Sequence, residues 1–227
     1  MDLEDLRAVS YTATQTQVLL SYRAGLFPMG VGVGGTGRMG WWAPRRRGVL
    51  LPGDLRVTKS LRKSMKHFTF SSDRAFEQVI RACADPNRSG AWITEEIIAL
   101  YLGLHSEGWA HSVEVWAADE LVGGLYGVAI GSFFAGESMF HTRRDASKAA
   151  LAHLVGLFDG AAGTGDDEDT DTADSATGEW LIDTQWQTSH LRSLGVSEIS
   201  GLEYSARLDS ALRGDLCQGI QQMNICR

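Results

Sequence analysis

A change in hydrophobic period limits the folds that this 227-residue chain can adopt. Three strand-like apolar runs follow one another within residues 111–140, separated by short turn segments. Before and after this region, apolar residues recur every three or four positions, which is the spacing of a helix with one buried face. Consecutive strands joined by short turns form an antiparallel meander. The sequence therefore predicts an α+β fold in which helices flank a sheet.

Helices and strands are expected in a fixed order around this meander. A helix over residues 12–25 opens the chain, and two more helices precede the meander. Short polar side chains mark helix starts because they accept backbone N–H groups there. Before the meander we expect a helix capped by Asp73 and a helix capped by Thr94. After it we expect a helix from Asp145, a strand over 180–185, a short helix ending at Gly195, a strand over 196–200 and a last helix over 202–213.

This order of elements resembles the acetyltransferase-like (GNAT) fold. We expect residues 1–55 to form a small N-terminal domain and residues 56–227 to form a GNAT-like domain with a mixed sheet. Residues 160–178 are acidic and contain no large apolar side chain, so we expect a disordered acidic loop there.

A glycine-rich stretch, GVGVGGTG at residues 30–37, has the spacing of a dinucleotide-binding fingerprint. That motif requires a strand before the glycines and a helix after them. Here a helical pattern precedes them, and Trp41-Trp42-Ala43-Pro44 follows. The stretch is interpreted as a flexible surface loop. Residues 141–148 also lack the glycines that hold a coenzyme A pyrophosphate at a helix start, so no cofactor is expected.

Charge is unevenly distributed along the chain. The net charge is −7, yet residues 38–66 contain nine basic residues and one acid, while six acids lie within residues 166–174. Such a basic segment can bind a polyanion, although it can also be an ordinary solvated face. The negative total therefore does not exclude a nucleic-acid partner.

The remaining composition excludes several classes of protein. Three widely spaced cysteines and six histidines show no metal-ligand spacing, so no metal is expected. The chain has no basic leader and no run of 18 apolar residues. We expect a reduced, cytoplasmic, monomeric protein without a membrane segment.

Three polar residues in apolar strands are candidates for chemistry. Asp183 and Gln185 lie two apart in LIDTQW and should share one face of a strand, and Glu137 lies in FFAGESMF. A buried carboxylate is costly unless it is paired or used. Structural carboxylates with satisfied hydrogen bonds and a catalytic site are both compatible with this pattern.

Several stretches, in this order and spacing, resemble the leucyl/phenylalanyl-tRNA–protein transferase family over about residues 18–213. They are SYRAGLFPM, WWAP, AWIT, HSVEVW, ELVGGLYGVAIGSFFAGESMF, ASKAAL and LIDTQW. The resemblance implies transfer of Leu or Phe, and less well Met, from aminoacyl-tRNA to the α-amine of proteins that begin with Arg or Lys. Such transfer marks proteins for N-degron degradation and uses no coenzyme.

The same resemblance implies roles for individual residues. Asp183 would contact the attacking amine, Gln185 would hydrogen-bond Asp183, and Glu137 would lie beside the substrate amine. The donor side chain would enter a pocket formed by Leu125, Phe134, Met139 and Leu154. Two tryptophans, Trp42 and Trp92, would lie near the terminal adenosine. The candidate phosphate contacts are Arg45, Arg46, Arg47, Arg62, Lys63 and Lys66.

Two alternatives remain open at this stage. One is a GNAT-fold acetyltransferase that uses acetyl-CoA, and the other is a tRNA-binding module without catalysis. The N-terminal segment also departs from the family pattern, because Phe27-Pro28-Met29 stands where Phe-Pro-Trp is usual.

Overall fold

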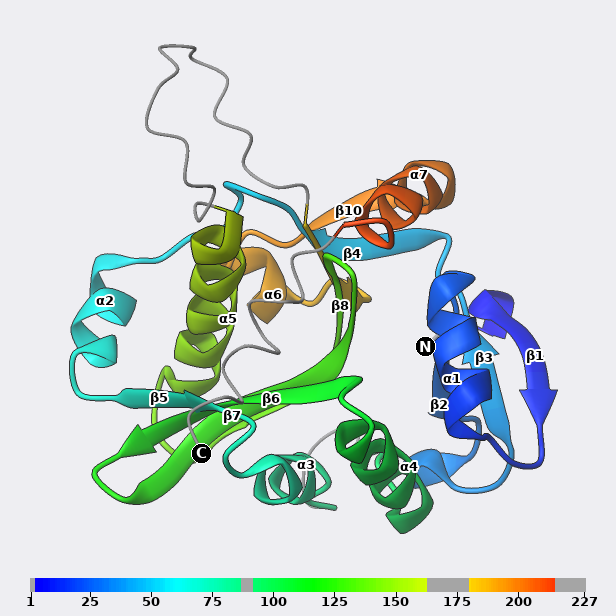
Figure 1. Ribbon diagram of the computed structural model, residues 1–227, viewed down its shortest axis with the longest axis horizontal. Coiled ribbons are helices and arrows are strands. Elements are labelled where there is room, and N and C mark those ends of the chain that lie inside the picture. Colours follow the sequence, from blue (N-terminus) through cyan, green and yellow to red (C-terminus); the bar gives the residue numbers. More distant parts are fainter. Residues whose placement is uncertain (1–2, 87–91, 163–179, 215–227) are drawn as a thin grey trace.

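A computed structural model describes residues 3–86, 92–162 and 180–214. It shows helices packed around two sheets, which confirms the predicted α+β class (Figure 1). The predicted acidic loop over residues 160–178 lies outside the described residues, except that 160–162 belong to a helix.

A three-stranded antiparallel sheet and one helix make up the N-terminal part. The sheet has the order β1-β3-β2, and the helix lies beside it. Their bounds are β1 (Leu6–Ser10), α1 (Gln15–Arg23), β2 (Phe27–Gly30) and β3 (Met39–Trp42), with short 3₁₀ turns η1 (Leu3–Asp5) and η2 (Val33–Gly35).

A seven-stranded mixed sheet in the order β10-β4-β9-β8-β7-β6-β5 forms the rest of the fold. The meander predicted over residues 111–140 is confirmed as β6, β7 and β8. The bounds are β4 (Arg46–Leu50), α2 (Lys59–Met65), β5 (Thr69–Ser72), α3 (Phe76–Cys83), α4 (Glu95–Ser106), β6 (Ala110–Ala117), β7 (Glu120–Ile130), β8 (Phe133–His141), α5 (Ala146–Ala162), β9 (Leu181–Gln185), α6 (Ser189–Ser193), β10 (Ser197–Ser200) and α7 (Gly201–Ala211).

Strand β4 was not predicted from the sequence, and it joins the large sheet although its residues fall within the expected N-terminal domain of residues 1–55. It pairs with β9 on one side and with β10 on the other. The change from the small sheet to the large one therefore falls between Trp42 and Arg46. The division of the chain into domains 1–55 and 56–227 remains a prediction.

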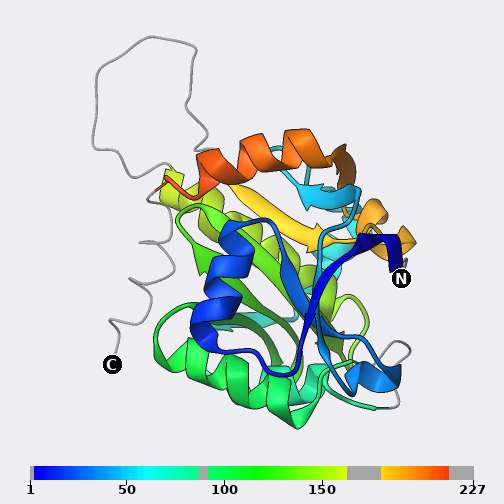
Figure 2. The same cartoon turned by 90° about the vertical axis from the view of Figure 1, so that its right-hand side faces the viewer.

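Apolar side chains bury both faces of the large sheet. On one face α5 packs on β6, β7 and β8, and α2 packs on α5. The other face is covered by α3, α4 and α7, and this core continues into α1 and the small sheet. Figures 1 and 2 show the sheet between these two helical layers. The central strands are therefore buried on both sides, which explains their nearly continuous apolar sequences.

One predicted helix cap is confirmed and one is wrong. The Thr94 hydroxyl accepts the backbone N–H of Ile97, as a cap of α4 should. Asp73 does not cap α3, because its carboxylate accepts the backbone N–H of Ser112 and pairs with His111 on β6 instead. Asp73 has a positive φ of 57°, so this cross-strand bonding holds a sharp turn before α3.

The glycine-rich stretch forms a closed turn between β2 and β3. Backbone hydrogen bonds run from Val31 N to Arg38 O and from Gly32 N to Thr36 O. Its surface position agrees with the prediction, since Val33 is 96% exposed. None of the helices in the part of the chain that the structure describes is long and apolar enough to cross a membrane.

We predict that Thr94→Ala lowers the free energy of unfolding by about 1 kcal/mol, because a backbone N–H at the start of α4 loses its acceptor. Urea denaturation measures the change. Thr94→Ser is the matched control and should lie within a few tenths of a kcal/mol of the parent protein. Equal losses in the two variants would show that the hydroxyl does not stabilise the helix.

Candidate active site

The two central parallel strands, β8 and β9, stop pairing just before the candidate residues Glu137 and Gln185. Strands β8 and β9 form the one parallel pair among the described strands, and their pairing ends at Ala135 and Asp183. Both strands continue beyond this point, so Glu137 and Gln185 lie two residues further along diverging strands. Glu137 and Gln185 therefore lie where β8 and β9 are no longer paired, and this unpaired region is here called the opening.

A cavity of about 100 Å³, here called the aliphatic cavity, lies on the α5 side of this opening. The four residues predicted to form the donor pocket all line it, and they come from β7, β8 and α5. Those residues are Leu125, Phe134, Met139 and Leu154. Leu151, Ile182 and Leu191 complete the apolar wall, while Glu137 and Gln185 stand at one end.

A second cavity of about 320 Å³, here called the aromatic cavity, lies on the N-terminal side of the opening. It is lined by Phe27, Met29, Trp92, Glu137, Gln185 and Trp186. The rings of Phe27 and Trp186 pack edge to face, with their centroids 5.0 Å apart. The two cavities thus share Glu137 and Gln185, and only these two polar side chains line both.

Of the two tryptophans expected near the terminal adenosine, Trp92 lines the aromatic cavity and Trp42 does not. Trp42 is completely buried, donates its indole N–H to the Met29 carbonyl oxygen at 2.9 Å and packs against the ring of Trp186. It therefore lies behind the cavity wall. Trp186 was not predicted as a site residue, although it directly follows Gln185 in the motif LIDTQW.

Two tyrosines hold the Glu137 carboxylate. Tyr22 from α1 and Tyr101 from α4 donate hydroxyl hydrogen bonds to its two oxygens, at 2.5 and 2.9 Å, and the two hydroxyls lie 2.6 Å apart. Burial raises the pKa of Glu137 from 4.5 to about 7, although these two hydrogen bonds act in the opposite direction. A proton can therefore enter or leave this carboxylate near neutral pH.

Asp183 is fully buried in an ion pair with Arg47. Arg47 donates from Nε to Oδ1 at 2.9 Å and from Nη2 to Oδ2 at 2.6 Å, and Tyr204 donates its hydroxyl to Oδ2 at 2.9 Å. Burial is the largest single influence and lowers the pKa of Arg47, but the charge and hydrogen bonds of Asp183, together with Tyr204 and Tyr22, raise the pKa above its ordinary value. Asp183 has no exposed surface and lines neither cavity. The expected contact of its carboxylate with a substrate amine stays a prediction, and in the structure the carboxylate is occupied by Arg47 and Tyr204.

Gln185 depends on Asp183 through its backbone. The N–H of Gln185 donates to Asp183 Oδ1 at 2.9 Å, and Gln185 has a positive φ of 58°. The predicted bond from its side chain to Asp183 is wrong. Instead, the side-chain amide borders both cavities, and its buried Nε2 has no hydrogen-bond partner among the described residues. A strained backbone and an unpaired buried donor are typical of a ligand-binding position.

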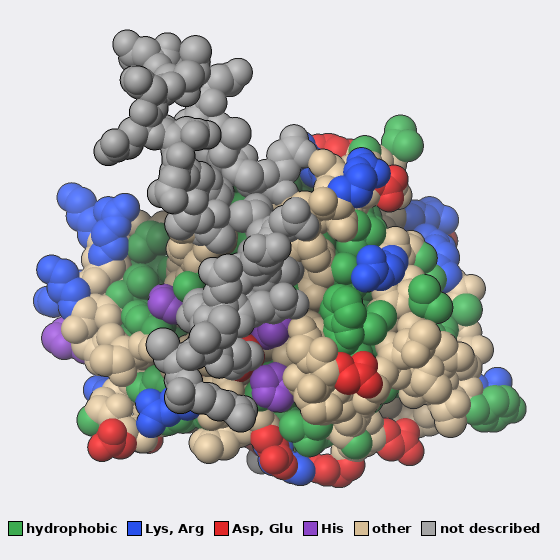
Figure 3. Space-filling model, viewed as in Figure 1, with side chains coloured by type: hydrophobic (Ala, Val, Ile, Leu, Met, Phe, Trp, Pro, Cys, Tyr) green, Lys and Arg blue, Asp and Glu red, His purple; other side chains and the backbone are tan. Residues whose placement is uncertain are grey.

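Five of the six basic residues predicted to contact RNA are on the surface, and the sixth is not. The exposed residues are Arg45, Arg46, Arg62, Lys63 and Lys66. Of these, Arg45 pairs with Glu4, and Arg62 and Lys63 belong to α2. Lys and Arg side chains gather at the left edge of Figure 3, where Figure 1 places α2. Arg47 is wrong as a phosphate contact, because its side chain is 2% exposed and pairs with Asp183.

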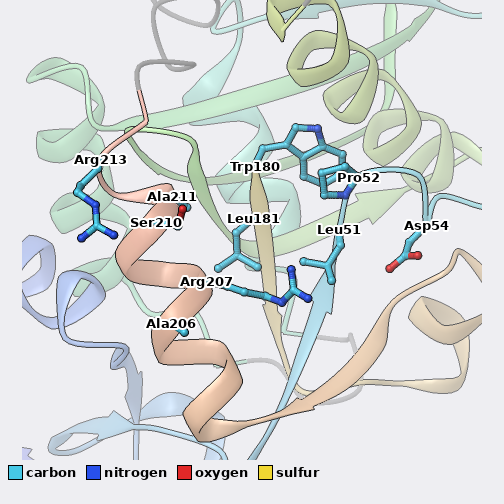
Figure 4. Close-up of a pocket in the computed structure, with 10 residues that line it drawn as sticks. All are labelled: Leu51, Pro52, Asp54, Trp180, Leu181, Ala206, Arg207, Ser210, Ala211 and Arg213. Carbon is cyan, nitrogen blue, oxygen red and sulfur yellow. The ribbon is translucent and has the colours of Figure 1, made fainter. Parts of the chain in front are cut away.

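A third cavity, of about 770 Å³, is lined by other residues than the two cavities described above. It lies between α7 and the beginning of β9, with Arg207 and Leu181 facing each other across it (Figure 4). No predicted site residue lines this cavity. Within the described residues, no cluster of three or more His, Cys, Asp or Glu side chains could hold a metal ion.

Comparisons with known proteins agree on one family. The family model described as leucyl/phenylalanyl-tRNA protein transferase matches residues 49–209. A leucyl/phenylalanyl-tRNA–protein transferase of Rhodopseudomonas palustris (strain BisB18) is 42% identical over 212 residues, which cover 91% of this chain and 84% of that protein. A protein of the same name from Methylococcus capsulatus is 43% identical over 205 residues, covering 88% and 79% respectively.

We predict that Asp183→Ala lowers the free energy of unfolding by about 3–5 kcal/mol, because it leaves the Arg47 charge buried and unpaired. Urea denaturation of this variant, of Arg47→Met, and of the double variant Arg47→Met/Asp183→Ala measures the effect. The double variant should lose less stability than either single variant, since no buried charge is left alone. Additive losses would contradict the assigned pairing.

We predict that Glu137 makes stability depend on pH. The folded-state pKa is raised to about 7, so its stabilising contribution is complete below pH 4.5 and is lost as the pH rises through about 7. Relative to Glu137→Gln, the parent protein should lose about 3 kcal/mol between pH 4.5 and 8. Chemical denaturation across this range measures the difference. A difference that stays constant with pH would show that the carboxylate titrates normally.

Proposed function

The chain belongs to the leucyl/phenylalanyl-tRNA–protein transferase family, and we propose that it transfers Leu or Phe, and less well Met, to the α-amine of proteins beginning with Arg or Lys. The family places it among aminoacyltransferases that act from tRNA to protein. The choice of these substrates, the marking of products for N-degron degradation and the GNAT-like fold are part of the proposal.

The main support for this proposal is that the aromatic cavity and the aliphatic cavity share two polar residues, Glu137 and Gln185. An aminoacyl-tRNA ends in an adenosine whose ribose bears an ester-linked amino acid. We assign the base to the aromatic cavity, where it can contact Trp92 and Trp186, because bases stack on aromatic side chains. The amino-acid side chain then occupies the aliphatic cavity, and the ester lies between the two shared residues.

Glu137 and Gln185 can then serve the reaction. The acceptor amine attacks the ester carbonyl carbon, and its excess proton passes to Glu137, whose pKa of about 7 suits a general base at neutral pH. Gln185 Nε2 donates to the carbonyl oxygen as negative charge develops on it. The carbon–oxygen bond to the ribose breaks, and the departing oxygen receives the proton from Glu137. The ester is already activated, so no covalent enzyme intermediate is needed.

Asp183 acts in this scheme as a positioning residue. It is separated from both cavities, but it accepts the backbone N–H of Gln185 and is itself fixed by Arg47 and Tyr204. A displacement of the carboxylate would move the amide of Gln185 away from the ester oxygen. Small displacements of reacting groups cost large factors in rate.

The aliphatic cavity accounts for a limited range of donors. Its lining contains no charged group except Glu137 at its end, and the remaining wall is largely aliphatic and aromatic. A pocket of this kind gains only about 1–3 kcal/mol per methylene, so it separates Leu, Phe and Met weakly. A cationic first residue of the acceptor is attracted to the Glu137 carboxylate in its ionised form.

We predict that the protein transfers label from radiolabelled Leu-tRNA to a protein beginning with Arg, and that Gln185→Ala lowers kcat by about 10²-fold because an oxyanion donor is lost. Glu137→Gln should lower it by a similar factor through loss of the base. The matched control is Glu120→Gln, the same change at the exposed start of β7, and it should retain full activity.

The same assay separates the two other functions. Label transferred from acetyl-CoA, and none from Leu-tRNA, would identify an acetyltransferase. Retention of tRNA on the folded protein without transfer would identify a binding module. Full activity of the Gln185 variant would remove this residue from the mechanism.

A further inference from the structure

The glycine-rich turn between β2 and β3 contacts the backbone of Trp92, which lines the aromatic cavity, and the proposed reaction gives the turn no role. Its Gly35 approaches the backbone of Trp92 so closely that a Cβ atom on Gly35 would lie 1.9 Å from the Trp92 carbonyl oxygen. Non-bonded atoms do not approach to this distance, so any side chain at position 35 would displace either the turn or Trp92.

A second contact of the same kind lies inside the turn. A Cβ atom on Gly30 would lie 1.8 Å from the carbonyl oxygen of Gly35. Gly30 directly follows Met29, and Met29 and Trp92 both line the aromatic cavity. Two successive glycine contacts therefore connect one wall of the cavity to the other, with no side chain between the backbones.

We propose that Gly30 and Gly35 are positioning residues that set the spacing between Met29 and Trp92, and hence the fit of a planar base in the aromatic cavity. The identity of the ligand rests on the proposed function. The spacing itself does not, because it follows from close contacts between backbone atoms that only glycine allows.

Two other glycines in the turn provide matched controls. Gly34 and Gly37 have φ values of 66° and 84°, close to the 74° of Gly35, so alanine is strained at all three positions. A Cβ atom on Gly34 or Gly37 would meet nothing within 4 Å. Comparison of the three alanine variants therefore separates backbone strain from displacement of Trp92.

The test combines kinetics with a structural probe. Gly35→Ala should raise KM for Leu-tRNA by about 10- to 100-fold, whereas Gly34→Ala and Gly37→Ala should change it less than about threefold. In protein labelled with 5-fluorotryptophan, the ¹⁹F resonance of Trp92, assigned with Trp92→Phe, should shift in Gly35→Ala and not in the two controls. Gly30→Ala should shift the Trp92 resonance as well, and this variant replaces Gly35→Ala in the test if Gly35→Ala does not fold.

The outcomes distinguish this inference from the proposed function. If the Trp92 resonance and KM respond alike in Gly35→Ala and Gly34→Ala, the positioning role is overturned. If the parent protein transfers nothing from Leu-tRNA while the Trp92 resonance moves only in Gly35→Ala and Gly30→Ala, the proposed function fails and the positioning role stands.

Discussion

The buried ion pair between Arg47 and Asp183 is the interaction on which the site depends. It joins β4 to β9 through two hydrogen bonds, and Tyr204 on α7 adds a third bond to the same carboxylate. Two charges removed from water require such complete pairing. The carboxylate is thereby fixed, and it holds the backbone N–H of Gln185 where β9 departs from β8. The position of Gln185 thus depends on a buried ion pair that lines neither cavity.

Sequence patterns predicted the parts of this structure that depend on local periodicity. The meander was found because strands repeat their apolar positions regularly, and the cap at Thr94 because a short polar side chain precedes a helical pattern. Glu137 was found because an acid in an apolar strand is unusual. These features require only knowledge of neighbours along the chain. Leu125 and Leu154 were assigned to a pocket only through the family resemblance, and both line the aliphatic cavity.

Features that depend on distant contacts could not be predicted in the same way. Arg47 is one of three consecutive arginines, and its sequence neighbourhood does not distinguish it from the exposed Arg46. Only the pairing of β4 with β9 directs it toward Asp183. Likewise, Tyr22 and Tyr101 read as ordinary core residues of their helices, since nothing local indicates that both meet a carboxylate on β8.

Tyr22 and Tyr101 come from different parts of the fold but bind the same carboxylate. Tyr22 comes from the helix beside the small sheet, whereas Tyr101 and Glu137 come from the larger part of the fold. A fragment beginning at Arg46 would retain every strand of the large sheet. It would lack Tyr22, however, so Oε1 of Glu137 would lose its hydrogen-bond donor. The N-terminal segment therefore completes the hydrogen bonding of a carboxylate in the other part of the fold, and its removal would expose that carboxylate as well as shorten the chain.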